Sequence, residues 1–431
     1  MMSFAPLLVA NAEAFFLSPS VTRATTSHAI SHAARMNDDC HEVELFSPAS
    51  ITLFNRILRF DAEEDALQGA SLLQAIDYGD TLRVAKRIAT DNEKSVEMEV
   101  SCVGDAAAEQ LPMTPNTEAI VGALTLFNQK VAERAAASSS DGSEARATSF
   151  RVQLIKRVPV GLGLNDASSN AAAALHAANA LCGYPASRKE LMEWGAELGG
   201  AVASFLTDSG SVYCTGHGDG FHYDRVESVV PMAGLKAGTR YLPLYLILPD
   251  VSLSTTAVVQ RLTEELRGGG IRGGATNRKG YAGRSEPDPQ TLLVAMGAYE
   301  GRWLTPALAE TLPPDGQLFL NDLQPYALDE SSQLAAVQAA LLEHGGLKAV
   351  LTGAGPAMHA FGALSEAAAP GGGDREPAER FARQLSAKVT AASGVRVRVI
   401  HAGFCSPPDE GFAAEARSWY VGPEFSRDGD L

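Results

Sequence analysis

Apolar side chains recur at helical spacing in several parts of the chain. Ile120, Leu124, Phe127 and Val131 lie three or four positions apart, which predicts a helix over 118–131. Similar apolar spacing, with glycine or proline close after the last turn, predicts further helices over 169–181, 188–198 and 331–344.

Runs rich in β-branched and aromatic residues predict strands. The first such run begins near Val43, where we expect folded sequence to begin, and extends to Phe60. Phe150–Ile155 alternates between apolar and polar positions, and Tyr241–Leu248 is apolar throughout and is expected to open a second domain. Shorter strands are expected over 71–75, 80–84, 211–214 and 349–351.

Polar stretches rich in Gly, Ala and Ser separate these elements. We interpret 135–147, 267–288 and 366–379 as loose surface insertions. The second of them is basic and has no acidic residue over 267–284, so a phosphate-gripping lid is its alternative interpretation. Its basic residues are Arg267, Arg272, Arg278, Lys279 and Arg284.

The composition of the chain limits which classes of ligand or partner are expected. The chain has 431 residues, of which 45% are hydrophobic and 20% charged, which suits a globular protein of two domains. A net charge of -16 argues against nucleic acid, and no apolar run has membrane-spanning length. The five cysteines form no CxxC pair, so we expect reduced thiols and no zinc site. We therefore expect a small-molecule ligand and no nucleic-acid or membrane partner. A monomer or a homodimer is a separate expectation, which composition does not decide.

The first forty residues are interpreted as a targeting segment. Met1–Ala14 is apolar and ends in small residues, and Phe15–Asn37 has no acidic residue. This two-part pattern resembles the presequences of algae with complex plastids and predicts a location in the plastid (chloroplast stroma). A disordered N-terminus, with a cytoplasmic location, is the alternative.

The segment Lys156–Leu175 carries the most informative chemistry. It predicts a strand end, a glycine-bearing loop and a helix that begins at Ser168 or Ser169. A helix start presents unpaired N–H groups and the positive end of a dipole, which suits a phosphate. The loop does not complete the dinucleotide-binding motif GxGxxG, because Asp166 occupies the third glycine position. It does not match the Walker phosphate-binding motif either, because no Gly-Lys-Ser/Thr follows.

A third pattern fits this loop better. Pro159-x-Gly161-x-Gly163-Leu164, followed by Ser168-Ser169-Asn170, resembles the phosphate loop of the GHMP small-molecule kinases. Within that family it is most similar to the 4-diphosphocytidyl-2-C-methyl-D-erythritol kinases. Other stretches resemble the same family in the same order, namely Phe46–Ala49, Gly79–Leu82, Tyr213–Gly216, Ser254-Thr255, Asn321–Pro325 and Gly353–Pro356.

The resemblance implies a fold and a nucleotide site. The fold would be of α+β class, with a ribosomal protein S5 domain 2-like domain over 41–225, a ferredoxin-like domain over 240–405 and a tail over 406–431. ATP would lie in the cleft between the domains, with Mg²⁺ held by Ser168 or Ser169. The residues implied to bind the nucleotide are Pro159, Gly161, Gly163, Asn165, Asp166, Ala167, Ser168, Ser169, Gly353 and Gly355.

The departures from the family pattern fall on its chemistry. The position of the family's lysine is Ser50, that of its catalytic aspartate is Ala201, and that of the histidine that contacts the cytidine base is Leu67. Asn165-Asp166-Ala167 replace three glycines that allow close phosphate approach. A carboxylate ~4 Å from a phosphate costs roughly 1–4 kcal/mol per charge pair. No family catalytic residue is therefore retained.

Two acidic residues are considered as substitutes. Asp166 can turn outward and bind Mg²⁺, and Asp208 can supply a carboxylate if the turn takes another path; otherwise Asp208 is an exposed loop acid. Lys156 and Arg157 flank the loop, and we interpret them as a solvated strand end.

The resemblance and its departures leave two main hypotheses for the function, and a third is also considered. By family, the protein phosphorylates the 2-hydroxyl of 4-diphosphocytidyl-2-C-methyl-D-erythritol with ATP, in non-mevalonate isoprenoid synthesis. By its residues, it is a catalytically inactive paralogue that acts as a binding or regulatory protein, and this interpretation is favoured. A family kinase with a changed substrate is the third possibility.

Overall fold

A long antiparallel hairpin forms the centre of the first of two sheets. In this computed structural model the described residues are 42–61, 66–87, 96–103, 114–138, 148–218, 223–231, 243–267, 320–362, 375–408 and 419–422, and all of them belong to one compact unit. The interpreted presequence and residues 268–288 lie outside the described residues, as do 366–374.

The first sheet has seven strands in the order β3-β4-β2-β1-β8, with β5 paired to the far part of β2 and β6 paired to β5. Its centre is rich in β-branched and aromatic residues, which suit a pleated, buried surface. The strands are β1 (Glu42–Asp61), β2 (Ala66–Arg87), β3 (Val96–Cys102), β4 (Ser149–Lys156), β5 (Ser211–Gly218), β6 (Tyr223–Pro231) and β8 (Leu320–Asn321).

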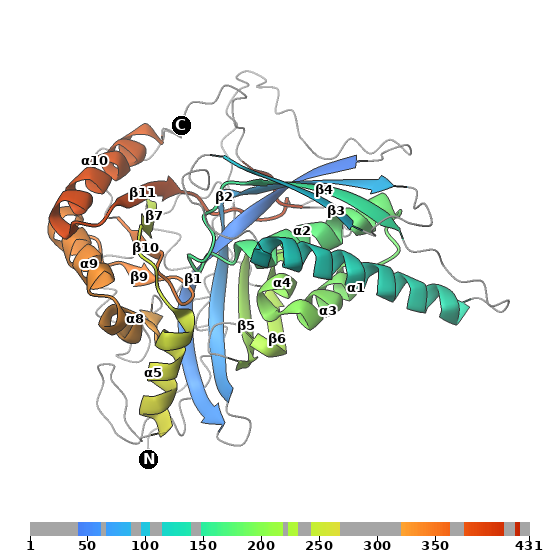
Figure 1. Ribbon diagram of the computed structural model, residues 1–431, viewed down its shortest axis with the longest axis horizontal. Helices are drawn as coiled ribbons and strands as arrows, with labels where there is room; N and C mark the ends of the chain where they lie inside the picture. Colours follow the sequence, from blue (N-terminus) through green and yellow to red (C-terminus); the bar gives the residue numbers. More distant parts are fainter. Residues whose placement is uncertain are drawn as a thin grey trace, which may run out of the picture. The chain divides into compact units, whose positions relative to one another are not determined.

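Four helices gather on one face of this sheet (Figure 1). They are α1 (Thr114–Ser138), α2 (Asp166–Leu181), α3 (Arg188–Leu198) and α4 (Gly200–Phe205). Helix α2 is buried around most of its circumference, because its alanines at 171–174, 177 and 178 are small enough for close packing between the sheet and α1. This packing fixes the start of α2, which ends the glycine loop.

The second sheet has four antiparallel strands in the order β11-β7-β10-β9. Helices α8, α9 and α10 line its outer side, and α5 lies beside α8 (Figure 1). The elements are β7 (Leu244–Pro249), α5 (Thr255–Arg267), α8 (Gln324–Glu330), α9 (Ser332–Gly345), β9 (Val350–Leu351), β10 (Met358–Phe361), α10 (Glu376–Ser393) and β11 (Val397–Ala402).

An apolar cluster joins the two sheets. Ile51 and Leu72 of the first sheet pack in one buried group with Leu246 of the second sheet and with Leu162 of the glycine loop. This two-sheet arrangement of helices and strands confirms the predicted α+β class. The predicted boundary between two domains stays a prediction.

The predicted elements agree with the structure in type and differ at their ends. Helix 188–198 is confirmed, whereas the helix expected from 169 begins three residues earlier, at Asp166. Residues 135–138 and 376–379 were expected in insertions and belong to α1 and α10. None of the described helices is long and apolar enough to cross a membrane.

The predicted tail contributes to the core. Trp419 and Tyr420 are buried at 8% and 4% exposure in the cluster around α2. The Trp419 indole N–H donates to the carbonyl oxygen of Phe46 at 2.8 Å, and its ring stacks on His176 with centroids 4.7 Å apart. Residues 419–422 therefore complete the packing of the first sheet.

Candidate active site

The glycine loop between β4 and α2 adopts left-handed backbone at three positions. Gly161 has φ 79°, Gly163 has φ 77° and Asn165 has φ 55°. Gly161 is exposed, whereas Gly163 and Asn165 are half-buried. A left-handed asparagine is tolerated because its short amide can bond locally, and here that amide donates to Ser50 Oγ at 2.9 Å.

The start of α2 carries no side-chain cap. Asn165 is the N-cap residue, but its amide is turned to Ser50, and the first helical bond runs from Ser169 N to Asn165 O at 2.9 Å. The N–H groups of Asp166, Ala167 and Ser168 therefore have no carbonyl partner within the helix. By contrast, α3 has a complete capping box from Ser187 and Glu190. The first turn of α2 can accept an anion.

A second glycine turn, Thr352–Gly355, packs directly on the first loop. Thr352 Oγ1 donates to Gly163 O at 3.3 Å and accepts from Thr52 N at 2.9 Å. A Cβ on Gly163 would lie 2.5 Å from Thr352 O, and one on Gly353 would lie 2.9 Å from Gly163 O. Gly163 and Gly353 thus have no room for a Cβ atom, because the two loops are in contact at these positions.

The side chain of Asn321 forms hydrogen bonds that fix the second glycine turn. Its Nδ2 donates to Leu351 O at 3.0 Å and to Gly353 O at 2.7 Å. Its Oδ1 accepts from Leu323 N at 2.9 Å and from Asn55 Nδ2 at 3.3 Å. Because Asn55 lies in β1, this amide ties the second glycine turn to the first sheet.

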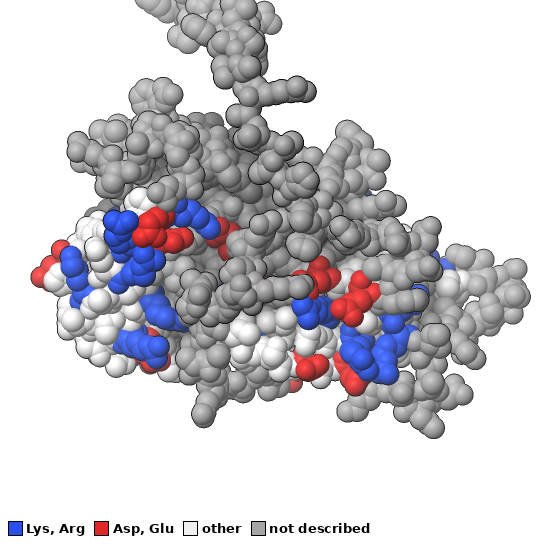
Figure 2. All heavy atoms as spheres, turned by 90° about the horizontal axis from the view of Figure 1, so that it is seen from above, with Lys and Arg blue, Asp and Glu red and all other residues white. Residues whose placement is uncertain are grey.

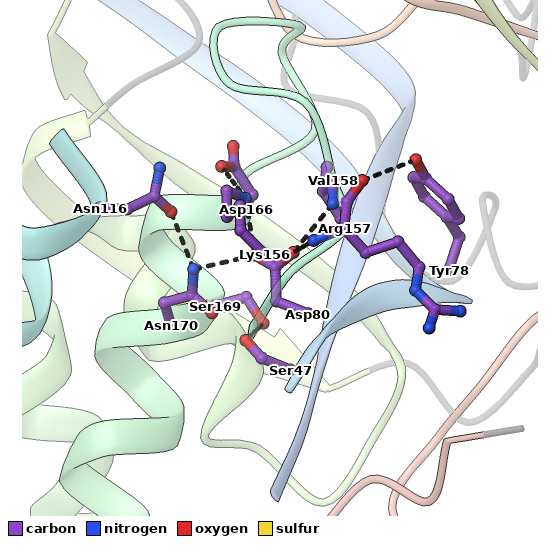
Figure 3. Close-up of polar contacts among 10 residues, drawn as sticks. All are labelled: Ser47, Tyr78, Asp80, Asn116, Lys156, Arg157, Val158, Asp166, Ser169 and Asn170. Carbon is purple, nitrogen blue, oxygen red and sulfur yellow. Dashed lines mark hydrogen bonds and ion pairs between the residues drawn. The ribbon is translucent and has the colours of Figure 1, made fainter. Parts of the chain in front are cut away.

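Lys156 is the centre of a buried ionic network beneath the loop. Alternation along β4 puts it on the same face as the buried Phe150 and Leu154, so its side chain enters the core. Its Nζ lies 2.6 Å from Asp80 Oδ2 and 2.7 Å from Asp166 Oδ2 (Figure 3). The expectation of a solvated strand end is wrong for Lys156, whose side chain is 0% exposed. Period-two alternation along β4 was the signal that could have revealed this.

Asp80 joins this network to the backbone of the loop. Its Oδ1 accepts from Arg157 N at 2.8 Å and Val158 N at 2.9 Å, and its Oδ2 accepts from Asn170 Nδ2 at 3.0 Å. Burial raises the pKa of the Asp80 carboxyl, against the attraction of Lys156. Burial disfavours the charged form of Lys156, but the two carboxylates outweigh it and raise the pKa of its ammonium.

The network continues into α1 and β1. Asn170 Nδ2 also donates to Asn116 Oδ1 at 2.8 Å, which links α2 to the first turn of α1 (Figure 3). The Ser169 hydroxyl lies 2.8 Å from that of Ser47 and is fully buried. The sequence analysis did not identify Asn116, and it included Ser47 in the stretch Phe46–Ala49 without predicting its contact with Ser169, because both contacts join residues distant in sequence.

The two expected metal ligands have different surroundings. Ser168 is half-buried on the first turn of α2, so its hydroxyl is better placed for Mg²⁺ than the buried hydroxyl of Ser169. Asp166 does not turn freely outward as expected, because Oδ2 is bound to Lys156 and the side chain is 10% exposed. Within the described ranges, no group of three or more His, Cys, Asp or Glu side chains could hold a metal ion.

Comparisons with known proteins identify the family. The pattern described as GHMP kinases N terminal domain matches residues 122–216. A 4-diphosphocytidyl-2-C-methyl-D-erythritol kinase of Salinispora tropica is 31% identical over 269 residues, which are 62% of this chain and 70% of that protein. The chain belongs to the GHMP kinase family.

A plant relative and a solved structure extend the comparison. The chloroplastic 4-diphosphocytidyl-2-C-methyl-D-erythritol kinase of Oryza sativa is 32% identical over 52% of this chain and 47% of its own, so the chain spans about half the length of this relative. A solved homoserine kinase from Cytophaga hutchinsonii aligns with 86% of this chain and 97% of its own, with a TM-score of 0.50 and 16% identity. The latter shows the shared two-sheet fold.

The two residues expected at the family's lysine and aspartate positions, Ser50 and Ala201, have different surroundings. Ser50 is 1% exposed, and its N–H donates to Leu164 O at 2.9 Å while its hydroxyl accepts from Asn165. Ala201 lies in α4 and packs beside Leu73 and Cys214.

The remaining candidate site residues differ in how far they are exposed to solvent. Asp208 is exposed in the turn before β5. Pro159, Gly353 and Gly355 are buried, and Ala167 is half-buried at the open end of α2. The structure thus brings the two glycine loops and Asp166 together. Their role in nucleotide binding stays a prediction.

Proposed function

We propose that the protein binds ATP as its Mg²⁺ complex, at the loop 159–169 and the start of α2, without the phosphoryl transfer of catalytic GHMP kinases. The observation that carries the binding is the uncapped first turn of α2, with half-buried Ala167 and Ser168 beside the exposed Gly161. Free N–H groups and the helix dipole favour phosphate oxygens there. Ser168 would hold the metal, which would screen the phosphate charges.

Two side chains lack the chemistry that phosphoryl transfer needs. The methyl group of Ala201 cannot accept the proton of a substrate hydroxyl, and loss of a general base costs about 10²–10⁴ in rate. Ser50 carries no positive charge, and its hydroxyl is bonded to Asn165. The site would bind a nucleotide and leave it intact, as a binding or regulatory protein would.

The relatives support a second candidate, an active 4-diphosphocytidyl-2-C-methyl-D-erythritol kinase. Identity of 31% over 70% of the Salinispora tropica protein favours it. Against it stands Leu67 at the position of the base-contacting histidine, which is 2% exposed and has no hydrogen-bonding group. The same replacement allows a family kinase with another substrate.

One pair of measurements separates these functions. Thermal unfolding with millimolar Mg²⁺·ATP should show a higher Tm, since ligand at 100 times Kd stabilises by about 2.7 kcal/mol. Incubation with Mg²⁺·ATP and the erythritol nucleotide should give no ADP above the protein-free blank. Turnover would overturn the proposal in favour of the kinase, and an unchanged Tm would exclude nucleotide binding.

A restored variant tests the cause of inactivity. Ser50→Lys with Ala201→Asp, and glycine at 165–167, should gain measurable ADP formation, while each single substitution gains none. Activity in the natural chain equal to that of the restored variant would contradict the argument.

The location is a separate proposal. The two-part pattern of residues 1–40 and the chloroplastic relative in Oryza sativa support a plastid location. Fusion of residues 1–45 to a fluorescent protein should direct it to plastids, whereas a cytosolic signal would contradict this.

A further inference from the structure

Strand β1 binds both glycine loops through two neighbouring polar residues. Ser50 and Thr52 lie two positions apart, so they share one side of β1, and they are 1% and 2% exposed. Ser50 holds the first loop, because its N–H donates to Leu164 O and its hydroxyl accepts from the Asn165 amide, both at 2.9 Å. The first loop is thus fastened to β1 without the help of the second turn.

Thr52 pairs with the second glycine turn by two hydrogen bonds of opposite direction. Its N–H donates to Thr352 Oγ1 at 2.9 Å, and its Oγ1 accepts from Gly353 N at 3.2 Å. The side chains of Thr52 and Thr352 are both buried. Buried N–H groups and hydroxyls are nearly always hydrogen-bonded, so this pair of bonds is costly to break.

The Thr352 hydroxyl also connects the second turn with the first loop. It donates its single proton to Gly163 O at 3.3 Å while it accepts from Thr52 N. A further bond between the two regions runs from Ala357 N, two residues after the second turn, to Leu162 O at 3.2 Å. One hydroxyl group therefore joins β1, the first loop and the second turn, which belong to both sheets.

We propose that Ser50, Thr52 and Thr352 form a clasp that holds the two glycine loops closed against each other, with the Thr352 hydroxyl as the joint. Separation of the loops would leave Thr52 N–H and Gly163 O without their partner, and an unpaired buried group costs more than an ordinary hydrogen bond contributes. Opening of the two loops is then one cooperative event and not two independent motions. The clasp consists of this chain's own groups, so its test needs no nucleotide.

Hydrogen–deuterium exchange of the full chain, resolved to single residues by mass-spectrometric fragmentation, tests the clasp. Thr352→Val replaces the hydroxyl with a methyl group of similar size. The N–H groups of Gly353 and Ala357 keep their own acceptors in this variant, so a purely local change would leave them protected. If the loops separate, both should exchange at least about tenfold faster. The N–H of Ser50, which is bound to the first loop independently, should keep its rate.

Two further variants are controls for packing. Thr352→Ser keeps the hydroxyl and loses only the methyl group, so exchange at Gly353 and Ala357 should stay close to the natural rate. Thr263→Val removes a hydroxyl that donates to Val259 O at 2.9 Å within α5, and it should change neither rate.

Each result decides for or against the clasp. Faster exchange at Gly353 and Ala357 in Thr352→Val, and not in Thr352→Ser, supports it. Unchanged exchange at either amide, equal acceleration in Thr352→Ser, or uniform acceleration that includes the buried Leu246 overturns it, and each of these leaves the proposed nucleotide binding untouched. If Thr352→Val does not fold, Thr52→Val decides, because it removes the acceptor of Gly353 N–H; unchanged exchange at Ala357 would then overturn the clasp.

Discussion

At the scale of single residues, burial changes what a charged side chain can do. Lys156 flanks a phosphate-type loop in sequence, yet its ammonium is directed into the core and is shared by Asp80 and Asp166. An ion in such surroundings needs its partners, because loss of one leaves an uncompensated buried charge. The lysine is therefore better understood as the support of the loop than as a ligand of phosphate.

Lys156→Met should lower the free energy of unfolding in urea by about 3–5 kcal/mol, because two buried carboxylates lose their counter-ion. The raised pKa of Lys156 means that its stabilisation is present below pH 10.5 and is lost as pH rises through the folded-state pKa. The gap between natural and variant proteins should thus narrow at strongly alkaline pH. Lys189→Met, at an exposed lysine 3.9 Å from Glu193, is the control and should have no measurable effect. A similar loss in both variants would contradict the network.

At the scale of elements, the two glycine loops behave as one unit. The first loop ends β4 and the second follows β9, and they meet where Thr352 contacts both Gly163 and Thr52. The spacing of hydrophobic residues predicted the helix or strand on each side of these loops. It could not predict that the loops touch, because their partners lie 189 and 300 positions apart in sequence.

Gly161 and Gly163 form a matched pair for a test of this contact. Both have φ near +78°, but nothing lies within 4 Å of a Cβ on Gly161, whereas one on Gly163 meets Thr352 O. Gly161→Ala should cost about 1–2 kcal/mol from the left-handed backbone alone. Gly163→Ala should cost about 1–3 kcal/mol more from overpacking, measured by urea unfolding. Equal costs would mean that the loops are not in contact.

The sequence predicted the fold class and family well, and the interior of the site poorly. Periodicity and family motifs predicted the order of elements, and the assignment of Ser50, Asp166 and Ala201 to family positions stays a prediction. The ionic network was missed because Lys156 was judged by its charge, while the alternation of β4 decides its direction. The early start of α2 was missed because Asp166 was assigned to the loop, although acidic residues favour the first turn of a helix.

At the scale of the whole chain, the negative net charge does not separate acidic from basic side chains on the described surface. The net charge is -16, but surface ion pairs such as Arg87–Glu97 and Arg380–Glu376 mix the signs. Figure 2 shows basic and acidic side chains interspersed over the described part of one face. No single-sign stripe stands out among the coloured residues there.

Trp419 tests how far the end of the described chain supports the first sheet. Trp419→Ala should lower the free energy of unfolding by about 3–5 kcal/mol, as for other buried large-to-small changes, and Trp419→Phe should lose much less. Val421→Ala, two residues away at 56% exposure, should be close to neutral. Chemical denaturation measures all three. A neutral Trp419→Ala would show that the indole adds nothing to this core.

The position of these last aromatic rings has a consequence for biosynthesis. Strands β1 and β2 and helix α2 leave the ribosome early, but the ring that stacks on His176 emerges more than two hundred residues later. The nascent N-terminal half must therefore wait with an apolar gap beside α2 until translation has passed residue 420. During that interval it would be a natural client for a chaperone that shields exposed apolar surface.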